Sequence, residues 1–509
     1  MGYARVCSVA LVGVTGAMVV VEADVANGLP RLVVSGLPDA ALTESRDRVR
    51  AAVVNSGERW PQQRITVNLL PAHLPKHGSG FDLAVAAAVL AAAGAVPAAA
   101  FDGVALLGEL GLDGTVRPVR GVLPAVMAAA RSGADLVVVP EGNAAEAQLV
   151  TGVTVRATDS LARLVRFARH GTGLLDPPRP RSVSPAPGAD LAEVLGQERG
   201  RRAVALAAAG GHHLALFGPP GAGKTMLAQR LPGVLPELGD AAAQEATAIH
   251  SIAGVLPAGS PLLLRPPFQA PHHTASEAAL VGGGSGLARP GALSLAHHGV
   301  LFLDEAPEFR QSALNALRQP LEDGEVRLRR SGGETVYPAR VQLVLAANPC
   351  PCANAAGDQH CQCSPLARRR YLGRLSGPLM DRVDLTVILR PVRSAALLAY
   401  QATGDSSAQV AAGVAEARAA AASRWLAAGA GAGRSNATVA SSALWAAGTR
   451  LPKQALRAAA RAVDTGLLSA RGYERVVRIA WSIADLDGRD RPVVGDVAEA
   501  LDLRAGAPW

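Results

Sequence analysis

The sequence predicts an α/β protein built around a phosphate-binding loop, with an α+β domain before it and a helical domain after it. A glycine-rich loop at residues 218–225 follows one apolar run and precedes a helix-like segment. Two further apolar runs end in polar residues, at Asp304-Glu305 and at Asn348. Continuous apolar runs of this length are typical of buried parallel strands. Because the carboxyl ends of parallel strands meet at one edge of a sheet, the three polar ends are expected to form one site.

The size and composition indicate a folded protein of several domains. The chain has 509 residues, of which 49% are hydrophobic and 18% are charged, and its net charge of +8 is compatible with a polyanionic partner. Two apolar stretches, 9–21 and 83–101, are interrupted by glycine or proline, so we interpret them as a strand–turn–strand and a buried helix. We therefore expect a cytoplasmic protein that has no membrane partner.

Four segments follow from the patterning. Residues 1–170 alternate valine-rich strands with alanine-rich helices, which predicts an α+β domain. Residues 171–189 are rich in proline and serine and predict an extended linker. Residues 190–392 carry the phosphate-binding loop, and residues 393–509 are helical and rich in alanine. In the first domain we expect strands at 18–25, 31–35, 65–70, 104–110 and 136–139, and helices at 41–55, 82–93 and 122–132.

The glycine-rich loop predicts a site for ATP and Mg²⁺. It reads Gly218-Pro219-Pro220-Gly221-Ala222-Gly223-Lys224-Thr225. Its glycines let the backbone turn N–H groups toward a phosphate, and the following helix adds its positive end. Lys224 is expected to reach the β- and γ-phosphates, and Thr225 to hold Mg²⁺. Only three of the 50 basic residues are lysines, and one stands where a compact charge fits between phosphates.

The two other strand ends supply the remaining groups for hydrolysis. Asp304 is expected to anchor Mg²⁺ through water, and Glu305 to polarise the attacking water. Asn348 is expected to contact the γ-phosphate or to orient that water. An apolar run that ends in Asp-Glu is common by itself. It becomes a specific sign of an ATPase site when it lies about eighty residues after a P-loop.

A basic β-hairpin is predicted at residues 325–340. Alternation places Val326 and Leu328 on one face and Arg327 and Arg329 on the other, with Arg330 next to the turn. Arginines at such a place can bind DNA phosphates without reading bases. A basic face that is merely solvated is the alternative.

Four of the five cysteines are clustered as Cys350-Pro351-Cys352 and Cys361-Gln362-Cys363. This spacing predicts a Cys₄ zinc site, in which His360 could replace one ligand. Reduced thiols that only pack, or a redox switch, remain alternatives. The adjacent pair His272-His273 is poorly arranged to hold one ion, so we interpret it as part of a structural or DNA-proximal loop, with a metal site as the alternative.

The motifs together resemble the ComM/YifB family of magnesium-chelatase-like AAA+ ATPases over nearly the whole chain. The resemblance rests on Gly28-Leu29-Pro30, on residues 76–83, on the P-loop, on Asn-Pro-Cys-Pro-Cys at 348–352 and on residues 376–385. It implies a hexameric DNA helicase with a helical lid, which promotes branch migration in homologous recombination and natural transformation and acts on branched or single-stranded DNA without sequence preference. A magnesium-chelatase-like motor or a chaperone-type remodeller of a protein partner is the alternative.

The resemblance also implies roles for single residues. Arg382 matches an arginine finger that acts on a neighbouring subunit's ATP; a salt bridge to Asp381 or Asp384 is the alternative. Arg471 matches the sensor 2 arginine that reaches bound nucleotide from the lid. Arg475 and Arg478 are alternatives, and so is a helix face on which all three are merely solvated. Val194 and Gly196 resemble residues that pack near adenine, and residues 325–340 resemble the pore-lining hairpin of related motors. Ala353 departs from the pattern, which has glycine there.

The N-terminal domain resembles the ribosomal-S5-domain-2-like fold that is shared with the Lon protease domain, which raises the hypothesis of a serine–lysine protease. Ser79 is the candidate nucleophile. However, the nucleophile position of Lon aligns with Gly80, and its catalytic lysine aligns with Leu123. Because a serine without a base is a poor nucleophile, we expect no peptidase activity and interpret the domain as a structural or docking module.

Overall fold

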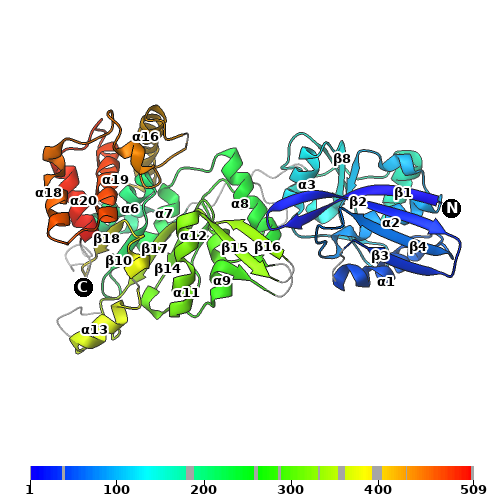
Figure 1. Cartoon of the computed structure of the whole chain (residues 1–509), viewed down its shortest axis with the longest axis horizontal. Helices are drawn as coiled ribbons and strands as arrows, with labels where there is room; N and C mark the ends of the chain where they lie inside the picture. Colours follow the sequence, from blue (N-terminus) through cyan, green and yellow to red (C-terminus); the bar gives the residue numbers. More distant parts are fainter. Residues whose placement is uncertain are drawn as a thin grey trace.

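The computed structural model describes residues 2–36, 40–178, 188–256, 262–284, 288–330, 333–353, 361–375, 377–391, 404–431 and 433–505. The molecule is elongated (Figure 1). A sheet formed by the first part of the chain lies at one end, the P-loop sheet lies in the middle, and the C-terminal helices lie at the other end. None of the described helices combines the length and the apolarity that crossing a membrane requires.

The first sheet has seven strands in the order β3-β4-β2-β1-β5-β8-β9. Its centre is a long antiparallel hairpin, which confirms the strand–turn–strand interpretation of residues 9–21. The strands β5, β8 and β9 extend it in parallel on one side, and β4 pairs antiparallel with β2 on the other. The strands are β1 (Gly2–Val12), β2 (Thr15–Ala26), β3 (Arg31–Ser35), β4 (Arg64–Leu70), β5 (Val104–Leu106), β8 (Leu136–Pro140) and β9 (Thr154–Thr158).

Helices cover both faces of this sheet. Every residue of α2 is buried, as expected for a core helix within residues 83–101. The predicted strand 104–110 is wrong as one element, because the chain leaves the sheet after β5: Gly108 donates its N–H to Gly80 at 3.0 Å, and a separate pair, β6 (Glu109–Leu110) and β7 (Val116–Arg117), follows. The helices are α1 (Ala40–Asn55), α2 (Asp82–Ala92), α3 (Val122–Arg131), α4 (Ala144–Ala147) and α5 (Leu161–His170), with short 3₁₀ turns η1 (Ser79–Phe81), η2 (Ala98–Phe101) and η3 (Glu141–Asn143).

The second sheet has five strands, all parallel, in the order β11-β14-β17-β10-β18. Side chains alternate between its faces, so Leu214 and Leu216 of β10 belong to one apolar core, and Ala215 and Phe217 belong to another. This buried parallel sheet is what the three apolar runs predicted. The strands are β10 (Leu214–Phe217), β11 (Phe268–Gln269), β14 (Val300–Leu303), β17 (Gln342–Ala347) and β18 (Leu385–Ile388).

The helices around the second sheet include α7, which starts at the end of the P-loop. They are α6 (Glu198–Gly210), α7 (Lys224–Val234), α8 (Asp240–Ala253), α9 (Glu277–Val281), α10 (Ala292–Leu295), α11 (Gln311–Ala316), α12 (Arg318–Asp323), α13 (Pro365–Leu372) and α14 (Gly377–Met380), with 3₁₀ turns η4 (Leu191–Glu193) and η5 (Ala306–Glu308) and a short pair, β12 (Gly282–Gly283) and β13 (Arg289–Pro290).

The predicted hairpin is present as β15 (Glu325–Arg330) and β16 (Gly333–Pro338), which pair antiparallel. Val326 is buried and Leu328 packs on the core, whereas Arg327 and Arg329 are exposed, as the alternation predicted. The side chain of Arg330 lies outside the described residues.

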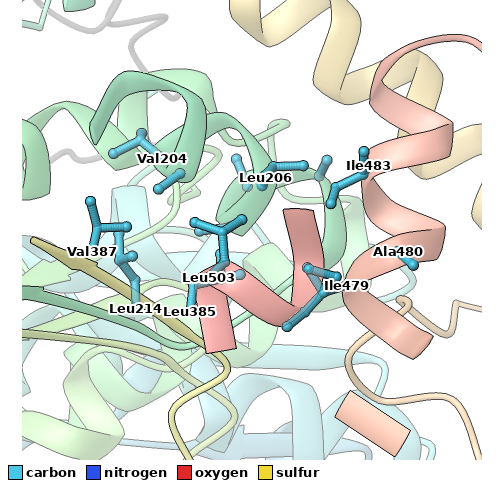
Figure 2. Close-up of a cluster of buried hydrophobic side chains, with 14 of the residues drawn as sticks. Val204, Leu206, Leu214, Leu385, Val387, Ile479, Ala480, Ile483 and Leu503 are labelled. Atoms are coloured by element: carbon cyan, nitrogen blue, oxygen red, sulfur yellow. The ribbon is translucent and has the colours of Figure 1, made fainter. Parts of the chain in front are cut away.

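The C-terminal helices share a core with the P-loop sheet. Figure 2 shows Ile479, Ile483 and Leu503 packed against residues of α6, β10 and β18. Within this core the rings of Trp425 and Trp481 meet edge to face, with centroids 5.8 Å apart. These helices therefore belong to the same hydrophobic core as one face of the sheet. They are α16 (Ser407–Ala427), α17 (Ser441–Leu444), α18 (Lys453–Asp464), α19 (Ala470–Leu486) and α20 (Val494–Ala505).

The two sheets are joined by contacts between α3 and α8 (Figure 1). The N–H of Gly121 donates to the carbonyl of Ser251 at 3.2 Å, and the hydroxyl of Ser251 bonds to Glu146. The turn of the β1–β2 hairpin also approaches the basic hairpin: a Cβ on Gly13 would lie 2.7 Å from the carbonyl oxygen of Val336. Of the predicted linker, residues 179–187 lie outside the described part of the chain.

Candidate active site

The P-loop connects the end of β10 to the start of α7. Hydrogen bonds to both neighbouring strands anchor its entrance, since Gly218 donates to Ala347 at 3.2 Å and Leu389 donates to Phe217 at 2.7 Å. Gly221 and Gly223 have φ values of +76° and +88°, which side chains other than that of glycine rarely adopt. Nothing in the described residues accepts a hydrogen bond from the N–H of either glycine. The loop therefore fits a phosphate group.

Lys224 lies at the centre of the site and is almost fully buried. Its ammonium group donates to the carbonyl oxygens of Gly218 and Pro219 at 2.7 and 2.9 Å, and to Oδ1 of Asn348 at 2.9 Å. Burial lowers its pKa, and the charges of the nearby Asp304 and Glu305 oppose that shift. The bond to Asn348 joins the end of β17 to the P-loop, as the parallel arrangement of the strands predicted.

The end of β14 meets the P-loop through Thr225. The hydroxyl of Thr225 donates to Oδ2 of Asp304 at 2.7 Å. The other oxygen of Asp304 accepts the N–H of Glu305 at 3.0 Å. Hydroxyl and carboxylate oxygens are the ligands that Mg²⁺ prefers, so these two residues fit the predicted magnesium site. Glu305 has a φ of +50° and a half-exposed side chain, which leaves its carboxylate open to water.

His273 lies beside Glu305, which the sequence analysis did not predict. Nδ1 of His273 is 3.4 Å from Oε2 of Glu305, and its ring packs on that of His272 with centroids 4.1 Å apart. The His-His pair follows β11, which pairs with β14 at the edge of the sheet. We expected the pair in a structural or DNA-proximal loop, and the structure places one of its members at the candidate active site. In the sequence, the position of the pair after an edge strand was the signal that could have placed it near the active site.

Gln197 is a second residue that the sequence analysis missed. Its buried amide donates to the carbonyls of Ala222 at 3.0 Å and Arg390 at 2.7 Å, and so ties the P-loop to the segment after β18. It belongs to the same Val-x-Gly-Gln segment as Val194 and Gly196. Val194 is buried in the core, and Gly196 has a φ of +65°. An adenine contact for these two residues stays a prediction.

Arg382 and Arg471 both lie at the amino end of the sheet. Both line a cavity of about 740 Å³. His213 and Val341, which directly precede β10 and β17, line the same cavity. The P-loop follows the carboxyl end of β10, so the two arginines lie at the opposite edge of the sheet from the P-loop of their own chain.

The ion pairs of this cavity differ from the alternative that the sequence suggested. Arg382 pairs with Glu322 and donates to the carbonyl of Pro378 at 2.7 Å, rather than bonding to Asp381 or Asp384. Asp384 instead bonds to Arg475, the first alternative to Arg471. Burial alone would raise the pKa of Asp384. The neighbouring His212, whose Nδ1 lies 3.4 Å from Oδ2, and the charge of Arg475 outweigh this effect, and the pKa lies well below its usual value.

Arg478, the other alternative to Arg471, is held within the helical region. It donates to the carbonyl of Val439 at 3.1 Å and lies 3.5 Å from Glu474. Arg471 is exposed at the start of α19 and lines the same cavity as Arg382. Of the three arginines, Arg471 is therefore the most accessible to a charged group from outside the chain.

The hairpin arginines are accessible, and each has an acidic neighbour. The side chain of Arg329 is 81% exposed and lies 3.3 Å from Glu334 on the paired strand. Arg327 is half exposed and pairs with Glu325 of the same strand. These exposed ion pairs contribute little to stability, so the arginines can exchange their partners at low cost.

The structure also brings the four clustered cysteines together. Sγ atoms of Cys350, Cys352, Cys361 and Cys363 all lie within 4.8 Å of one another, which is a geometry that a metal ion can use. They follow the end of β17 and precede α13.

The residues considered for peptidase chemistry do not form a serine–lysine pair. The hydroxyl of Ser79 bonds to the carboxylate of Glu109. Leu123 is fully buried, and its N–H donates to Glu146 at 2.9 Å. The buried Lys76 donates to the carbonyls of Leu69 at 2.9 Å and Pro71, and burial lowers its pKa.

Comparisons with known proteins show which families the chain resembles. The family described as magnesium chelatase, subunit ChlI, matches residues 190–397, and related ChlI families match residues 21–143 and, as the C-terminal part of that subunit, residues 404–504. The similarity to Lon is limited: Lon protease 2 of Bacillus subtilis is 31% identical over 96 residues, which is 19% of this chain and 17% of that protein.

Several relatives match along almost their whole length. An uncharacterised protein of Mycobacterium tuberculosis is 55% identical over 99% of both chains. YifB of Escherichia coli is 40% identical over 97% of this chain and 96% of its own. The competence protein ComM of Haemophilus influenzae is 39% identical over 99% of this chain and 98% of its own. The chain therefore belongs to the ComM/YifB family of magnesium-chelatase-like AAA+ ATPases.

Proposed function

We propose that the protein is an ATP-driven motor that acts on DNA, as a branch-migration helicase of homologous recombination and natural transformation. The observation that carries the ATPase part is the convergence of three strand ends on Lys224 and Thr225. The DNA part is supported by the exposed arginines of the hairpin, by the net charge of +8 and by the similarity to a competence protein.

The residues of the site divide the work of hydrolysis. The N–H groups of the P-loop bind the phosphates, and Lys224 balances their charge. Thr225 and Asp304 would hold Mg²⁺, which would supply positive charge next to the phosphates. Glu305 accepts the proton of the water that attacks the γ-phosphorus, and Asn348 positions that water. His273, beside Glu305, orients its carboxylate.

We propose that Arg382 and Arg471 act on the ATP of a neighbouring subunit. Their place at the amino edge of the sheet is far from the P-loop of their own chain, but it can face the carboxyl edge of a second copy. An arginine supplied in trans stabilises the charge of the transferred phosphoryl group. This arrangement requires a homo-oligomer, which we propose to be a hexameric ring.

The basic hairpin is the proposed DNA contact. Arg327, Arg329 and Arg330 would bind phosphates of branched or single-stranded DNA without sequence preference. ATP-driven movement of the hairpin relative to the ring would then move the strand.

The remaining proposals concern the layout of the chain. Residues 1–170 are proposed to form a Lon-like docking domain, 171–189 a linker, 190–392 the ATPase domain and 393–509 a helical lid domain. Because the described C-terminal helices share a core with β10 and β18, we propose that this last domain moves together with the sheet. The protein is proposed to act in the cytoplasm.

The test is the ATPase and strand-displacement activity of the purified protein, with and without branched DNA, over a series of salt concentrations. The proposal predicts that DNA stimulates hydrolysis, and that the stimulation weakens as salt rises because phosphate contacts release counterions. If DNA neither binds nor stimulates hydrolysis at low salt while the basal ATPase is intact, the DNA part of the proposal is wrong.

The second candidate function is a magnesium-chelatase-like or chaperone-type motor that remodels a protein. The match to the ChlI families over most of the chain favours it, and so do the acidic partners of Arg327 and Arg329, which reduce the positive charge of the hairpin. In the same assay this candidate predicts an ATPase that is insensitive to DNA and is stimulated by a protein partner.

A further inference from the structure

Four cysteine sulfurs converge where the chain leaves β17. Sγ of Cys350 is 3.1 Å from that of Cys352 and 3.3 Å from that of Cys361, and Cys352 and Cys361 are 3.5 Å apart. Cys363 lies within 4.8 Å of all three. The cluster combines two elements that are separate in the sequence, because Cys350 follows Asn348 by two residues and Cys363 precedes α13 by two.

These distances fit ligands around one ion better than they fit disulfides. A disulfide holds its sulfurs about 2.0 Å apart, which is well below all three distances. Four thiolates at about 2.3 Å from a tetrahedral zinc ion have sulfurs about 3.8 Å apart, which is close to the arrangement seen. All four cysteines are free thiols in the structure.

The backbone of the cluster is strained in a way that also points to a bound ion. Ala353 has a φ of +47°, and its N–H donates to the carbonyl of Cys350 at 3.3 Å. A residue with a Cβ rarely adopts this left-handed conformation, whereas glycine adopts it readily. Such strain persists where the surroundings impose it, and ligation of Cys350 and Cys352 to one ion would impose this turn.

The second group with a metal-like geometry among the described residues is Glu245, His297 and His298. Both histidines place Nε2 near Oε2 of Glu245, at 3.0 and 2.8 Å. However, Nδ1 of His297 accepts the N–H of Arg340 at 3.0 Å, so the neutral ring carries its proton on Nε2 and has no lone pair there for a metal. We therefore assign no ion to this group.

We propose that Cys350, Cys352, Cys361 and Cys363 bind one structural Zn²⁺ as a tetrathiolate. Thiolates select zinc among the common divalent ions, and four protein ligands leave no open position, which is typical of a structural role. The ion would fix the segment between Asn348 of the active site and α13, whose Tyr371 and Leu372 pack into the core of the sheet. Arg369 and Arg370 of α13 are exposed, so the ion would thereby hold a basic helix at the end of β17.

The test is the metal content of the full-length protein, purified without added chelator or metal. We expect one zinc per chain in the wild type, and a loss of at least half of it in Cys361→Ser and Cys363→Ser. The matched control is Cys7→Ser, which removes the fifth cysteine, in β1. This variant should keep the full zinc content of the protein. His298→Asn tests the second group and should also keep the full content.

A second measurement, made on the wild-type protein, tests the proposal even if the variants fail to fold. Wild-type protein in which Co²⁺ replaces Zn²⁺ should show the intense thiolate-to-cobalt and visible bands of a tetrahedral four-sulfur site. Wild-type protein with no bound zinc and four freely titrating thiols would overturn the proposal, and so would bound iron, or a mass that shows two disulfides. None of these readouts depends on ATP or DNA, so their outcome is separate from that of the proposed function.

Discussion

Five polar residues meet at the carboxyl edge of the sheet, and we propose that they determine the chemistry of the site. Lys224 and Thr225 belong to the P-loop pattern, and Asp304, Glu305 and Asn348 end two further apolar runs. Their meeting at one edge could be predicted because the carboxyl ends of parallel strands lie together. The position of His273 could not be predicted. Its contact with Glu305 depends on the path of the chain after an edge strand of two residues, and no local pattern specifies that path.

Lys224→Ala is expected to abolish most of the ATP hydrolysis. Removal of the ammonium group takes away a charge that stabilises the phosphoryl group in the transition state, so kcat should fall at least about 10²–10³-fold. Lys453→Ala, at an exposed lysine of α18, is the matched control and should keep full activity. Substantial hydrolysis by the Lys224 variant would show that another site or a contaminating enzyme is responsible.

His273→Ala is expected to lower kcat about 10-fold and to leave KM for ATP nearly unchanged. The imidazole contacts the carboxylate of Glu305 and not the phosphate-binding loop, and partners that orient an active-site group have effects of roughly this size. His272→Ala, which removes the ring that packs against His273, should have a smaller effect. Equal rates for the His273 variant and the wild type would rule out a positioning role.

His213 is expected to make the stability of the P-loop sheet depend on pH. Burial lowers its pKa to about 4, and its Nδ1 accepts the N–H of Leu343 at 3.0 Å, which requires the neutral ring. Between about pH 6.5 and 4 the unfolded chain binds a proton that the folded chain does not, so stability is lost as the pH falls through this range. The full loss is about 3 kcal/mol.

The measurement is urea unfolding at several pH values, followed by tryptophan fluorescence, since Trp425 and Trp481 are buried in the core that includes β10. His213→Asn keeps an acceptor for Leu343 but cannot titrate, so its stability should change less between pH 7 and 5. A pH dependence identical to that of the wild type would mean that other groups cause it. His297, whose pKa is also lowered to about 4 by burial, remains in both proteins as an internal reference.

The secondary-structure elements were predicted where their pattern is local. The alternation of β15 and the apolar runs of β10, β14 and β17 specify strands without help from the rest of the chain. The strand 104–110 was predicted as one element because its residues are apolar, but Gly108 bonds to Gly80 and takes the chain out of the sheet. A tertiary contact of this kind leaves no periodic signal in the sequence.

The basic hairpin is expected to bind DNA through Arg327 and Arg329. The double variant Arg327→Ala/Arg329→Ala should weaken binding of all DNA sequences equally and reduce the slope of log affinity against log salt by about 2. The double variant Glu325→Gln/Glu334→Gln removes the acidic partners and should strengthen binding. If neither pair of changes alters the affinity or its salt dependence, DNA binds elsewhere.

At the scale of the whole molecule, the main difference from expectation is where the C-terminal helices place their arginines. The sequence identified Arg471 as a residue that reaches nucleotide from the lid. In the structure, α19 and α20 share a core with α6 and β18 (Figure 2), and Arg471 at the start of α19 lines the same cavity as Arg382, next to the amino edge of the sheet. Motifs identify such residues, but only packing decides which edge of the sheet they face. We therefore propose that a second subunit completes each ATP site.

Mixing two inactive variants tests this claim most directly. Arg382→Ala keeps its own P-loop but cannot complete a neighbour's site, whereas Lys224→Ala lacks a working P-loop but keeps Arg382. When the two are mixed under conditions that allow subunits to exchange, some interfaces combine an intact P-loop with an intact Arg382, and we predict that ATP hydrolysis reappears. A mixture that never exceeds the sum of its two components, or an Arg382→Ala protein that is fully active alone, would contradict a site shared between subunits.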